Sequence, residues 1–314
     1  MGLATAFSRR QRCVVAPPVS DRPDVSVVVV SYNTRELLRA CLAAVHLSTG
    51  STLELFVVDN DSSDGSAEMV ETEFPSVVLI RNTENRGFAA ANNVALSMAT
   101  GRAFLLLNPD TVVAPDSIAT LAGYLEANPD VGVCGPLVVN PDRSYQSCGY
   151  LYPTLLSEVQ QAKNLGRLIR AIVGPAPLVA PHRAPTDVDW VDGCCLMIRR
   201  QAIEEIGLLD EQFFMYAEEL DWCFNANRRG WRIVAHPGTA IVHHGGQSSK
   251  QIAERSLALL VETRLRYYRK NLGLTTAVLV SIMYLAGVIK RYRAERVKSR
   301  AKLRGVWQWV RSLS

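Results

Sequence analysis

Residues 103–110, with the sequence AFLLLNPD, decide how the rest of the chain is interpreted. The apolar residues Ala103 to Leu107 are enough to cross a buried sheet, and they run directly into a polar Asn-Pro-Asp corner. This order predicts that the Asp110 carboxylate lies just past the carboxyl end of a strand, at the edge where open α/β sheets bind ligands. A carboxylate there can hold a metal ion and, through it, a phosphate. The octapeptide alone fits a simple Asx turn at Asp110 equally well.

Alternating strands and helices precede this stretch. The first strand, VSVVVV, is too apolar to be half exposed and predicts a central parallel strand covered on both faces. Strand, turn and helix then repeat, which is typical of a parallel α/β sheet. The expected strands lie at residues 25–30, 53–58, 77–81 and 103–107, and the helices begin near residues 34, 67, 89 and 116.

The turns between these strands and helices restrict the kind of ligand site. Asn33 and Glu36 have the spacing of a capping box, so we expect the first helix to start at Thr34. The strand-to-helix turns contain neither G-x-G-x-x-G nor G-x-x-x-x-G-K-[ST], which disfavours a dinucleotide or P-loop site. We therefore expect ligands to be held by side chains and a metal.

The second half of the chain is less regular. Residues 155–172 have helical periodicity and precede a proline-rich loop at 174–185, and we interpret this region as an insertion that shapes a second substrate's site. Residues 189–198 return to strand character and lead into a helix at 200–206.

Three acids crowd the start of a later helix, in the sequence FFMYAEELDWCF at residues 213–224. Negative charge is stabilised at a helix N-terminus, so Glu218, Glu219 and Asp221 can be explained as capping alone. The aromatic run before them and the second acidic corner at Asp110 favour a general base in an apolar setting. Farther on, IVHHGGQS at residues 241–248 places an imidazole on a slender loop at a strand's end, which favours contact with a metal or phosphate.

Basic residues are concentrated at the C-terminus. The chain has 314 residues, of which 48% are hydrophobic and 20% charged, with a formal net charge of +4, as in a globular protein. From Arg264 onward there are thirteen Lys or Arg residues and one acid, Glu295, so the preceding 263 residues carry a net charge of −8. The basic residues are not interleaved with the expected pocket, which disfavours nucleic acid and favours a membrane surface as partner.

The N-terminus and the cysteines indicate a cytosolic protein. Arg9, Arg10 and Arg12 have no apolar stretch behind them, which disfavours a signal peptide, and Ala6 departs from the myristoylation pattern. Residues 1–23 are expected to be a flexible lead-in. The seven cysteines are scattered without a C-x-x-C pair, as expected of reduced thiols in a core.

The C-terminal region, residues 251–314, predicts helices that are basic and apolar. Residues 252–269 have amphipathic periodicity, and the uncharged stretch 271–289 is at the lower limit for crossing a bilayer. The basic residues 290–304 are followed by an apolar stripe with tryptophan at its edge. This pattern favours a helix lying in an anionic membrane interface over one that spans it. The alternative is a helical hairpin packed on the core or on a second subunit, and the latter would make a homo-oligomer.

With these features in place, the chain resembles the family 2 glycosyltransferases of the GT-A fold, and among them the rhamnosyltransferase-like bacterial enzymes that build cell-surface polysaccharide. Six pieces match in the family's order over about residues 24–250. They are VVVVSYN at 27–33, VVDNDSSDG at 57–65, NRGF at 85–88 with Asn92, NPD at 108–110, FMYAEELD at 214–221 and HHGG at 243–246.

The resemblance implies an α/β fold built from two halves. A Rossmann-like nucleotide-sugar-binding half, residues 24–136, with a mostly parallel central sheet would be fused to an acceptor and catalytic half, residues 137–250. The lead-in, residues 1–23, would precede this GT-A domain, and the membrane-associating helical tail, residues 251–314, would follow it.

By this resemblance, one group of side chains binds the donor nucleotide and another holds a metal ion. Asp59 would accept a hydrogen bond from the imide N–H of the base. The NPD corner stands where the family has its Asp-x-Asp metal motif and keeps only the second acid, so Asp110 is the expected ligand of Mg²⁺ or Mn²⁺. His243, with His244 as the alternative, would complete the metal or diphosphate site. The donor-binding residues implied are Tyr32, Asn33, Asp59, Arg86, Asn92, Asn108 and Asp110.

The same resemblance implies an inverting reaction. The run Glu-Glu-Leu-Asp resembles the family's Glu-Asp base motif, with Glu219 where an Asp often stands, and it leaves Glu219, Glu218 and Asp221 as candidates for the base. The base would take the proton from an acceptor hydroxyl as that oxygen attacks the anomeric carbon in line.

Rhamnose from dTDP-rhamnose, and a cell-surface glycan or polyprenyl-linked acceptor, are the substrates that the resemblance suggests. The enzyme would then work at the cytoplasmic face of the cell membrane as a peripheral protein. One alternative is a nucleotidyltransferase, which would need a Gly-rich basic phosphate loop that residues 31–34 lack. Another is a catalytically degenerate glycosyltransferase-like scaffold at the membrane, because Asn108 replaces the first acid of the metal motif.

Overall fold

The computed structural model describes residues 21–147, 149–155, 183–245, 253–291 and 296–312. Most of the predicted helix at 155–172, most of the proline-rich loop and nearly all of the predicted lead-in therefore lie outside the described residues.

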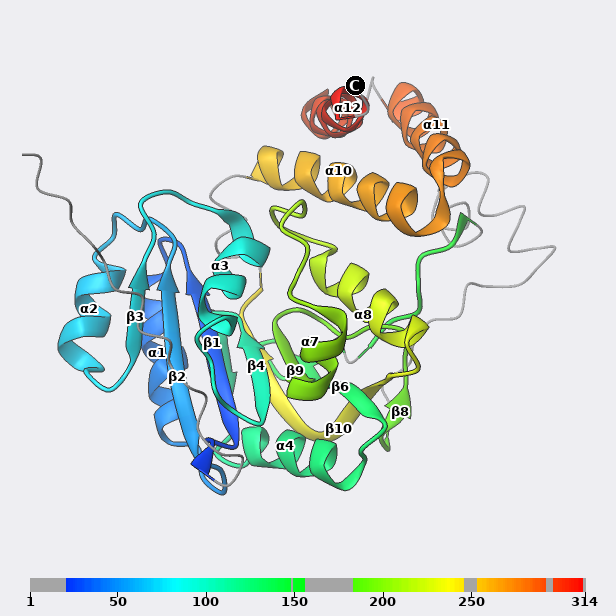
Figure 1. The fold of residues 1–314 in the computed structure, drawn as a ribbon. Coiled ribbons are helices and arrows are strands. Elements are labelled where there is room, and N and C mark those ends of the chain that lie inside the picture. The colour runs from blue at the N-terminus through cyan, green and yellow to red at the C-terminus, as the bar shows by residue number, and fades with distance from the viewer. Residues whose placement is uncertain (1–20, 148, 156–182, 246–252, 292–295, 313–314) are drawn as a thin grey trace, which may run out of the picture.

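One mixed sheet forms the centre of the fold. The described residues place ten strands in it, in the order β3-β2-β1-β4-β9-β6-β10-β5, with β7 beside β6 and β8 beside β10 (Figure 1). The first four strands in the chain are parallel, as predicted. Strand β9 then runs antiparallel to both β4 and β6, so the sheet as a whole is mixed rather than mostly parallel. The strands are β1 (Val25–Ser31), β2 (Leu53–Asp59), β3 (Val78–Arg81), β4 (Ala103–Leu107), β5 (Thr111–Val113), β6 (Val131–Val139), β7 (Tyr145–Ser147), β8 (Thr186–Asp187), β9 (Cys195–Arg199) and β10 (Arg232–His243).

Helices cover both faces of this sheet. One face packs against α1, α2 and α4, and the other against α3, α7 and α8. The bounds of these helices are α1 (Arg35–His46), α2 (Ser66–Glu73), α3 (Gly87–Leu96), α4 (Ser117–Ala127), α7 (Arg200–Ile206) and α8 (Glu218–Arg228).

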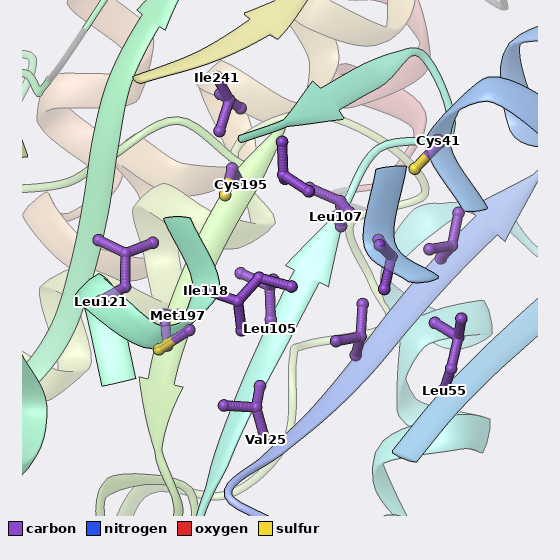
Figure 2. Packing of buried hydrophobic residues seen from close by; sticks show 14 of the residues in the cluster. Val25, Cys41, Leu55, Leu105, Leu107, Ile118, Leu121, Cys195, Met197 and Ile241 are labelled. Atoms are coloured by element: carbon purple, nitrogen blue, oxygen red, sulfur yellow. The ribbon is translucent and has the colours of Figure 1, made fainter. Parts of the chain in front are cut away.

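The two faces divide the buried side chains of each central strand. Successive side chains of a strand point to opposite faces, so Leu105 and Leu107 of β4 enter one core while Leu106 enters the other. Figure 2 shows the first core, where Leu105 and Leu107 lie near Cys195 and Met197 of β9. The five cysteines in the described residues are free and buried, as predicted. Two-sided burial explains why the central strands are almost uninterrupted runs of apolar residues.

The predicted capping box at the start of α1 is wrong, although the start of the helix is right. Thr34 is the N-cap residue and its side chain makes no capping hydrogen bond. Asn33 has a positive φ of 52°, and its Oδ1 accepts from the N–H of Ser63, 2.8 Å away. The N–H of Arg35 instead donates to Asp64 Oδ2 at 2.8 Å. A loop distant in sequence therefore supplies the cap that the local spacing predicted within the helix itself.

The C-terminal helices are α10 (Ala253–Leu272), α11 (Leu274–Arg291) and α12 (Arg296–Arg311). They lie together on one side of the molecule (Figure 1), and α10 packs on the body of the protein through Leu265, Tyr267 and Tyr268, which lie in one buried cluster with Phe213 and Leu220. Packing on the core was the alternative interpretation of this region, and it is the one the structure shows for α10. Within the described part of the chain, no helix combines the length and apolarity that crossing a membrane requires.

Candidate active site

Strand register brings the predicted site residues to one edge of the sheet. Ser31 at the end of β1 is opposite Asp59 at the end of β2, so the turn that follows β1 lies beside Asp59. Strand β4 is parallel to β1 and ends at Leu107, directly before the Asn-Pro-Asp corner. His243 at the end of β10 pairs with Thr111, the residue after Asp110. The carboxyl edge therefore gathers the corners that the sequence predicted there.

Asp110 and His243 form the centre of this edge. Their Oδ1 and Nε2 atoms are 3.2 Å apart, and both side chains are largely buried. His243 Nδ1 lies 2.8 Å from Gln146 Oε1, which fixes the ring, and the N–H of His244 donates to the Asp110 carbonyl at 2.9 Å. His243 thus faces the Asp110 carboxylate, whereas His244 holds the backbone of the corner.

The electrostatics of this pair favour a cation. Burial acts to lower the pKa of His243, but the nearby Asp110 carboxylate outweighs it, and the net effect is a raised pKa. His243 Nε2 is buried and has no well-directed hydrogen bond within the described residues. When Nδ1 donates to Gln146, Nε2 presents a lone pair toward a carboxylate, which a proton or a metal ion between them would make favourable. The nitrogen and oxygen atoms present fit Mn²⁺ or Mg²⁺, but the described residues contain no group of three or more His, Cys, Asp or Glu side chains that could enclose a metal ion.

The two carboxylate oxygens of Asp59 differ in their hydrogen bonding. Its Oδ2 accepts from the N–H of Ser62 at 3.1 Å, while Oδ1 is buried with no hydrogen-bond partner in the described part of the chain. Tyr32 and Asn33 follow β1 beside it and are partly exposed. A buried acceptor without a donor is unfavourable, so this oxygen is suited to accept from a ligand N–H.

A side chain that the sequence interpretation overlooked, Asn60, organises the next loop. Its Oδ1 accepts from Asn82 Nδ2 at 2.9 Å and from the N–H of Arg86 at 3.1 Å, and its Nδ2 donates to Asn85 Oδ1 at 3.0 Å and to the Gly87 carbonyl at 3.2 Å. The amide therefore uses all its hydrogen-bonding capacity on one loop. No local spacing in the sequence predicts this role, because the partners lie more than twenty residues away.

The two other predicted nucleotide-binding residues on this side are Arg86, the N-cap residue of α3, and Asn92, in the middle of that helix. The guanidinium of Arg86 is 40% exposed and lies 3.7 Å from the Glu211 carboxylate. Asn92 is buried, and its Nδ2 donates to the carbonyl of Phe88 at 2.9 Å while Oδ1 has no partner among the described residues. Arg86 thus reaches the surface, whereas Asn92 is enclosed by the protein.

Gly87 joins this loop to the acidic turn before α8. The N–H of Phe88 donates to the carbonyl of Phe214 at 2.6 Å. A Cβ added to Gly87 would lie 2.2 Å from that carbonyl oxygen, and the φ of Gly87 is +80°. Only glycine allows so close an approach. The segment that carries the predicted base is therefore docked on the loop that carries Arg86.

The three candidate bases have different surroundings. Glu218 and Glu219 are the first two residues of α8, and the Oε2 atom of each is buried with no hydrogen-bond partner in the described residues. Burial raises the pKa of Glu219 to about 7, with the charge of Asp192 adding to the effect. Burial and the charge of Glu219 raise the pKa of Glu218 well above its ordinary value. Asp221 is buried too, but Lys270 and Asn271 donate to its oxygens.

Asp192 is a further carboxylate at this edge, and the sequence interpretation did not single it out. Because β9 runs antiparallel to β4, the loop before Cys195 returns to the edge where β4 ends. Asp192 Oδ1 accepts from the N–H of Cys194 at 3.1 Å, and Oδ2 accepts from Ser147 Oγ at 3.2 Å and from Tyr150 Oη at 3.3 Å. Its charge raises the pKa values of both Glu219 and His243. A signal was present in the polar Asp-Gly pair that precedes β9.

Comparisons with known proteins identify the family of this chain. The sequence matches the family model described as Glycosyl transferase family 2 over residues 26–173 and the one described as Glycosyl transferase family group 2 over residues 103–310. Over 248 residues it is 29% identical to an N-acetylglucosaminyl-diphospho-decaprenol L-rhamnosyltransferase of Mycobacterium tuberculosis, which covers 71% of this chain and 76% of that protein. It is 24% identical over 252 residues, 79% of this chain and 76% of the relative, to a hexosyltransferase of low-salt glycan biosynthesis in Haloferax volcanii.

Solved structures share the fold. A mannosyltransferase from Pyrobaculum calidifontis in complex with GDP-Man and Mn²⁺ superposes with a TM-score of 0.57 at 20% identity, covering 92% of this chain and 81% of that one. GalNAc-T7 with UDP, GalNAc and Mn²⁺ gives a TM-score of 0.52 at 17% identity, covering 79% and 50%.

Fold and site together define a glycosyltransferase with the GT-A architecture. The chain belongs to glycosyltransferase family 2 and is similar to its rhamnosyltransferases.

Proposed function

We propose that the protein transfers a sugar, with inversion, from a nucleotide diphosphate donor to a hydroxyl of a glycan or lipid-linked acceptor. The observation that carries this proposal is the meeting of a partnerless buried Asp59 oxygen, the Asp110–His243 pair and the Glu219 turn at one edge of the sheet. Residues 24–136 would bind the donor and residues 137–250 the acceptor.

The donor nucleotide lies, in this proposal, against the ends of β1 and β2. Asp59 Oδ1 accepts the N–H of the base, which supplies the donor that this buried oxygen lacks. Tyr32 and Asn33 flank the base, and Arg86 offers an exposed guanidinium to the donor. Asn92 supports the same pocket from α3.

Asp110 and His243 would hold a divalent metal ion together with oxygens of the donor diphosphate. Two protein ligands leave most coordination positions to the donor, so metal and donor would bind together. When bound, the metal offsets the negative charge that grows on the departing diphosphate. The Mn²⁺ in both structural neighbours supports this assignment, with Mg²⁺ equally suited to oxygen ligands.

Glu219 is the base in this mechanism. A carboxylate with a pKa near 7 is half ionised at neutral pH and accepts a proton more readily than an ordinary glutamate. Burial and the charge of Glu219 raise the pKa of the neighbouring Glu218 well above its ordinary value, so the two carboxyl groups do not ionise independently. The acceptor oxygen loses its proton to Glu219 as it bonds to the anomeric carbon, and the bond from that carbon to the diphosphate breaks.

The substrates we propose follow from the relatives. The mycobacterial relative is named as a rhamnosyltransferase acting on a decaprenyl diphosphate-linked N-acetylglucosamine, which favours dTDP-rhamnose as donor and a polyprenyl-linked glycan as acceptor here. The test is a panel of nucleotide sugars, each with and without Mn²⁺, read as thermal stabilisation and then as transfer. Stabilisation by no nucleotide sugar would overturn the donor site. Nucleotidyl transfer would support the first alternative, and donor binding without sugar transfer or hydrolysis would support the degenerate scaffold.

We also propose that α11 and α12 attach the enzyme to an anionic membrane surface. Figure 1 places these helices on the far side of α10 from the sheet. Ile282 on α11 and Trp307 on α12 are 56% and 58% exposed, and Arg311 covers the Trp307 ring at 3.7 Å. Exposed apolar residues beside a strongly basic sequence fit an interface of anionic lipid. Other large exposed apolar residues on the two helices are Leu274, Val278, Leu279, Leu303 and Val310.

Vesicle flotation tests this attachment. The full chain should float with phosphatidylglycerol vesicles and much less with phosphatidylcholine vesicles, and salt should weaken the binding because surface charge attraction is screened. Trp307→Ser should reduce flotation, while Tyr145→Ser, which removes an exposed aromatic residue on β7, should not. Equal recovery with both lipids, or none with either, would favour helices that pack only on protein.

A further inference from the structure

Helix α10, the first of the C-terminal helices, is hydrogen-bonded to the first turn of α8, which carries the proposed base. Lys270 Nζ donates to Asp221 Oδ2 at 2.7 Å, and Asn271 Nδ2 donates to Asp221 Oδ1 at 2.7 Å. Lys270 also donates to Asp210 Oδ2 at 2.7 Å. The Asp221 carboxylate is almost completely buried. The last turn of α10 is thus fastened to the first turn of α8, fifty residues away in the chain.

Local sequence does little to fix this turn of α8. Ala217 is the N-cap residue, has a positive φ of 67° and offers no side-chain cap, and Tyr216 before it has a φ of 73°. Two successive non-glycine residues with positive φ are unfavourable unless the surrounding structure holds them in that conformation. The N–H of Phe88 holds the Phe214 carbonyl on one side, and α10 holds Asp221 on the other.

The contact between α10 and Asp221 also buries a carboxylate, which is unfavourable unless its oxygens find partners. A buried carboxylate is stable only when its oxygens are paired and hydrogen-bonded. Burial acts to lower the pKa of Lys270, but Asp210 and Asp221 outweigh it and raise that pKa, so the ammonium charge is kept. Asn225 Nδ2 adds a longer contact to Asp221 Oδ2 at 3.3 Å. All the donors named here come from side chains rather than from α8 backbone N–H groups, which separates this arrangement from ordinary helix capping.

Apolar packing joins the same two segments. Leu220, beside Glu219 and Asp221 in the chain, lies in one buried cluster with Leu265 and Tyr268 of α10. The ring of Phe213 lies 5.7 Å from Lys270 Nζ. Burial raises the pKa of Glu219, and the charge of Arg264 on α10 opposes that rise. Helix α10 therefore contacts the first turn of α8, and Phe213 before it, through polar, apolar and charged groups.

We propose that Lys270 and Asn271 are positioning residues for transfer, which act through Asp221 to hold the first turn of α8 and hence Glu219. The proposal rests on the proposed role of Glu219 as base. Asp221 is then a structural anchor of the base and not the base itself. The helical tail is part of the catalytic apparatus as well as a covering of the core.

Single substitutions in the full chain test this proposal. Lys270→Met removes the charged donor from Asp221 and should lower kcat about tenfold or more, with the donor KM changed less than about twofold. Lys270→Arg keeps the positive charge but replaces a compact ammonium by a planar guanidinium, so it should restore kcat in part. Asn271→Ala should lower kcat in the same direction by a smaller factor. The matched control is Arg269→Met, because Arg269 is exposed and its guanidinium contacts Ser312 rather than α8.

Two readouts separate the possible failures. Thermal stabilisation by donor and Mn²⁺ must persist in Lys270→Met, which shows that the variant is folded around its donor site. Wild-type kcat in Lys270→Met and Asn271→Ala, in an enzyme that Glu219→Gln inactivates, would overturn the positioning role and leave the proposed function intact. An active Glu219→Gln variant would overturn the base assignment first. Equal loss in Lys270→Arg and Lys270→Met would also contradict positioning by a retained cation.

Discussion

The proposed metal ligand Asp110, in the Asn-Pro-Asp corner (the metal corner), and the proposed base Glu219, in the first turn of α8 (the base turn), lie at the same edge of the sheet but are held there by different means. Asp110 follows β4 directly, and its place is set by strand register, since β4 pairs with β1 and β10 pairs with β5. Glu219 begins a helix whose approach has two positive φ angles, and it is fixed by contacts with Gly87 and with α10. One corner is a product of local sequence and sheet geometry, and the other of tertiary packing.

This difference tells us where each residue's role can be damaged. A change in the metal corner acts on the ligand atoms themselves, because the backbone beneath them belongs to the most buried part of the sheet. A substitution far from Glu219, even in the C-terminal helices, would affect transfer by shifting α8, the helix that carries Glu219.

Glu219→Gln should abolish transfer, by a factor of roughly 10² to 10⁴ in kcat, because the amide cannot accept the acceptor's proton. Donor binding with Mn²⁺, measured by calorimetry, should be unchanged. Glu218→Gln is the matched control. Burial and the charge of Glu219 raise the pKa of its carboxyl and so favour the neutral form, and replacement by a neutral amide should therefore lower kcat far less. Unchanged turnover in Glu219→Gln would remove this residue from the role of base.

Asp110→Ala should weaken metal-dependent donor binding by roughly 10-fold to 100-fold, since it removes one of two proposed protein ligands. Titration calorimetry with and without Mn²⁺ measures the effect, and the loss should appear only with metal present. Asp116→Ala, which removes an exposed acid with no capping hydrogen bond, is the control. Equal affinity of Asp110→Ala and the parent protein would refute the metal assignment.

The same difference separates the site residues that the sequence predicted from those that it did not. The run AFLLL and the polar corner after it required only strand burial and parallel pairing to place Asp110, so that prediction needed no distant partner. Asn60 and Asp192 escaped notice because their roles arise from partners that the chain brings back from more than twenty residues away. The choice between Glu219 and Asp221 stayed open for the same reason, since Lys270 and Asn271 meet Asp221 only in the folded protein.

The pH dependence of transfer should report the base turn. As the proposed base, Glu219 would act only when ionised, and burial raises its pKa to about 7. The rate kcat should therefore fall about tenfold for each pH unit below this value and level off above it. Initial rates between pH 5.5 and pH 8.5, on the order of seven points, would define the limb. A flat profile over this range would contradict a base with a raised pKa, whereas Glu219→Gln should lose the limb.

The smallest effect is expected at the start of α1, where local spacing and tertiary contact gave opposite answers. Asp64 Oδ2 accepts from the N–H of Arg35 and Oδ1 from the N–H of Ser66, so one carboxylate caps α1 and α2. Asp64→Ala should lower the free energy of unfolding by about 1 to 2 kcal/mol at pH 7, measured by urea denaturation. Glu36→Ala, in the predicted capping box, should change it by less than about 0.5 kcal/mol.

Acid offers a second way to separate these two residues. Burial acts to raise the pKa of Asp64, but the hydrogen bonds from Ser66 and Arg35 outweigh it, and the pKa is lowered. A carboxylate with a lowered folded-state pKa stabilises the protein above its unfolded pKa of about 4 and loses that contribution as the pH falls through the folded value. The difference in stability between Asp64→Ala and the parent should therefore shrink in acid. A larger loss of stability for Glu36→Ala than for Asp64→Ala would contradict this assignment. It would show that the local capping box, and not the distant Asp64, stabilises the start of α1.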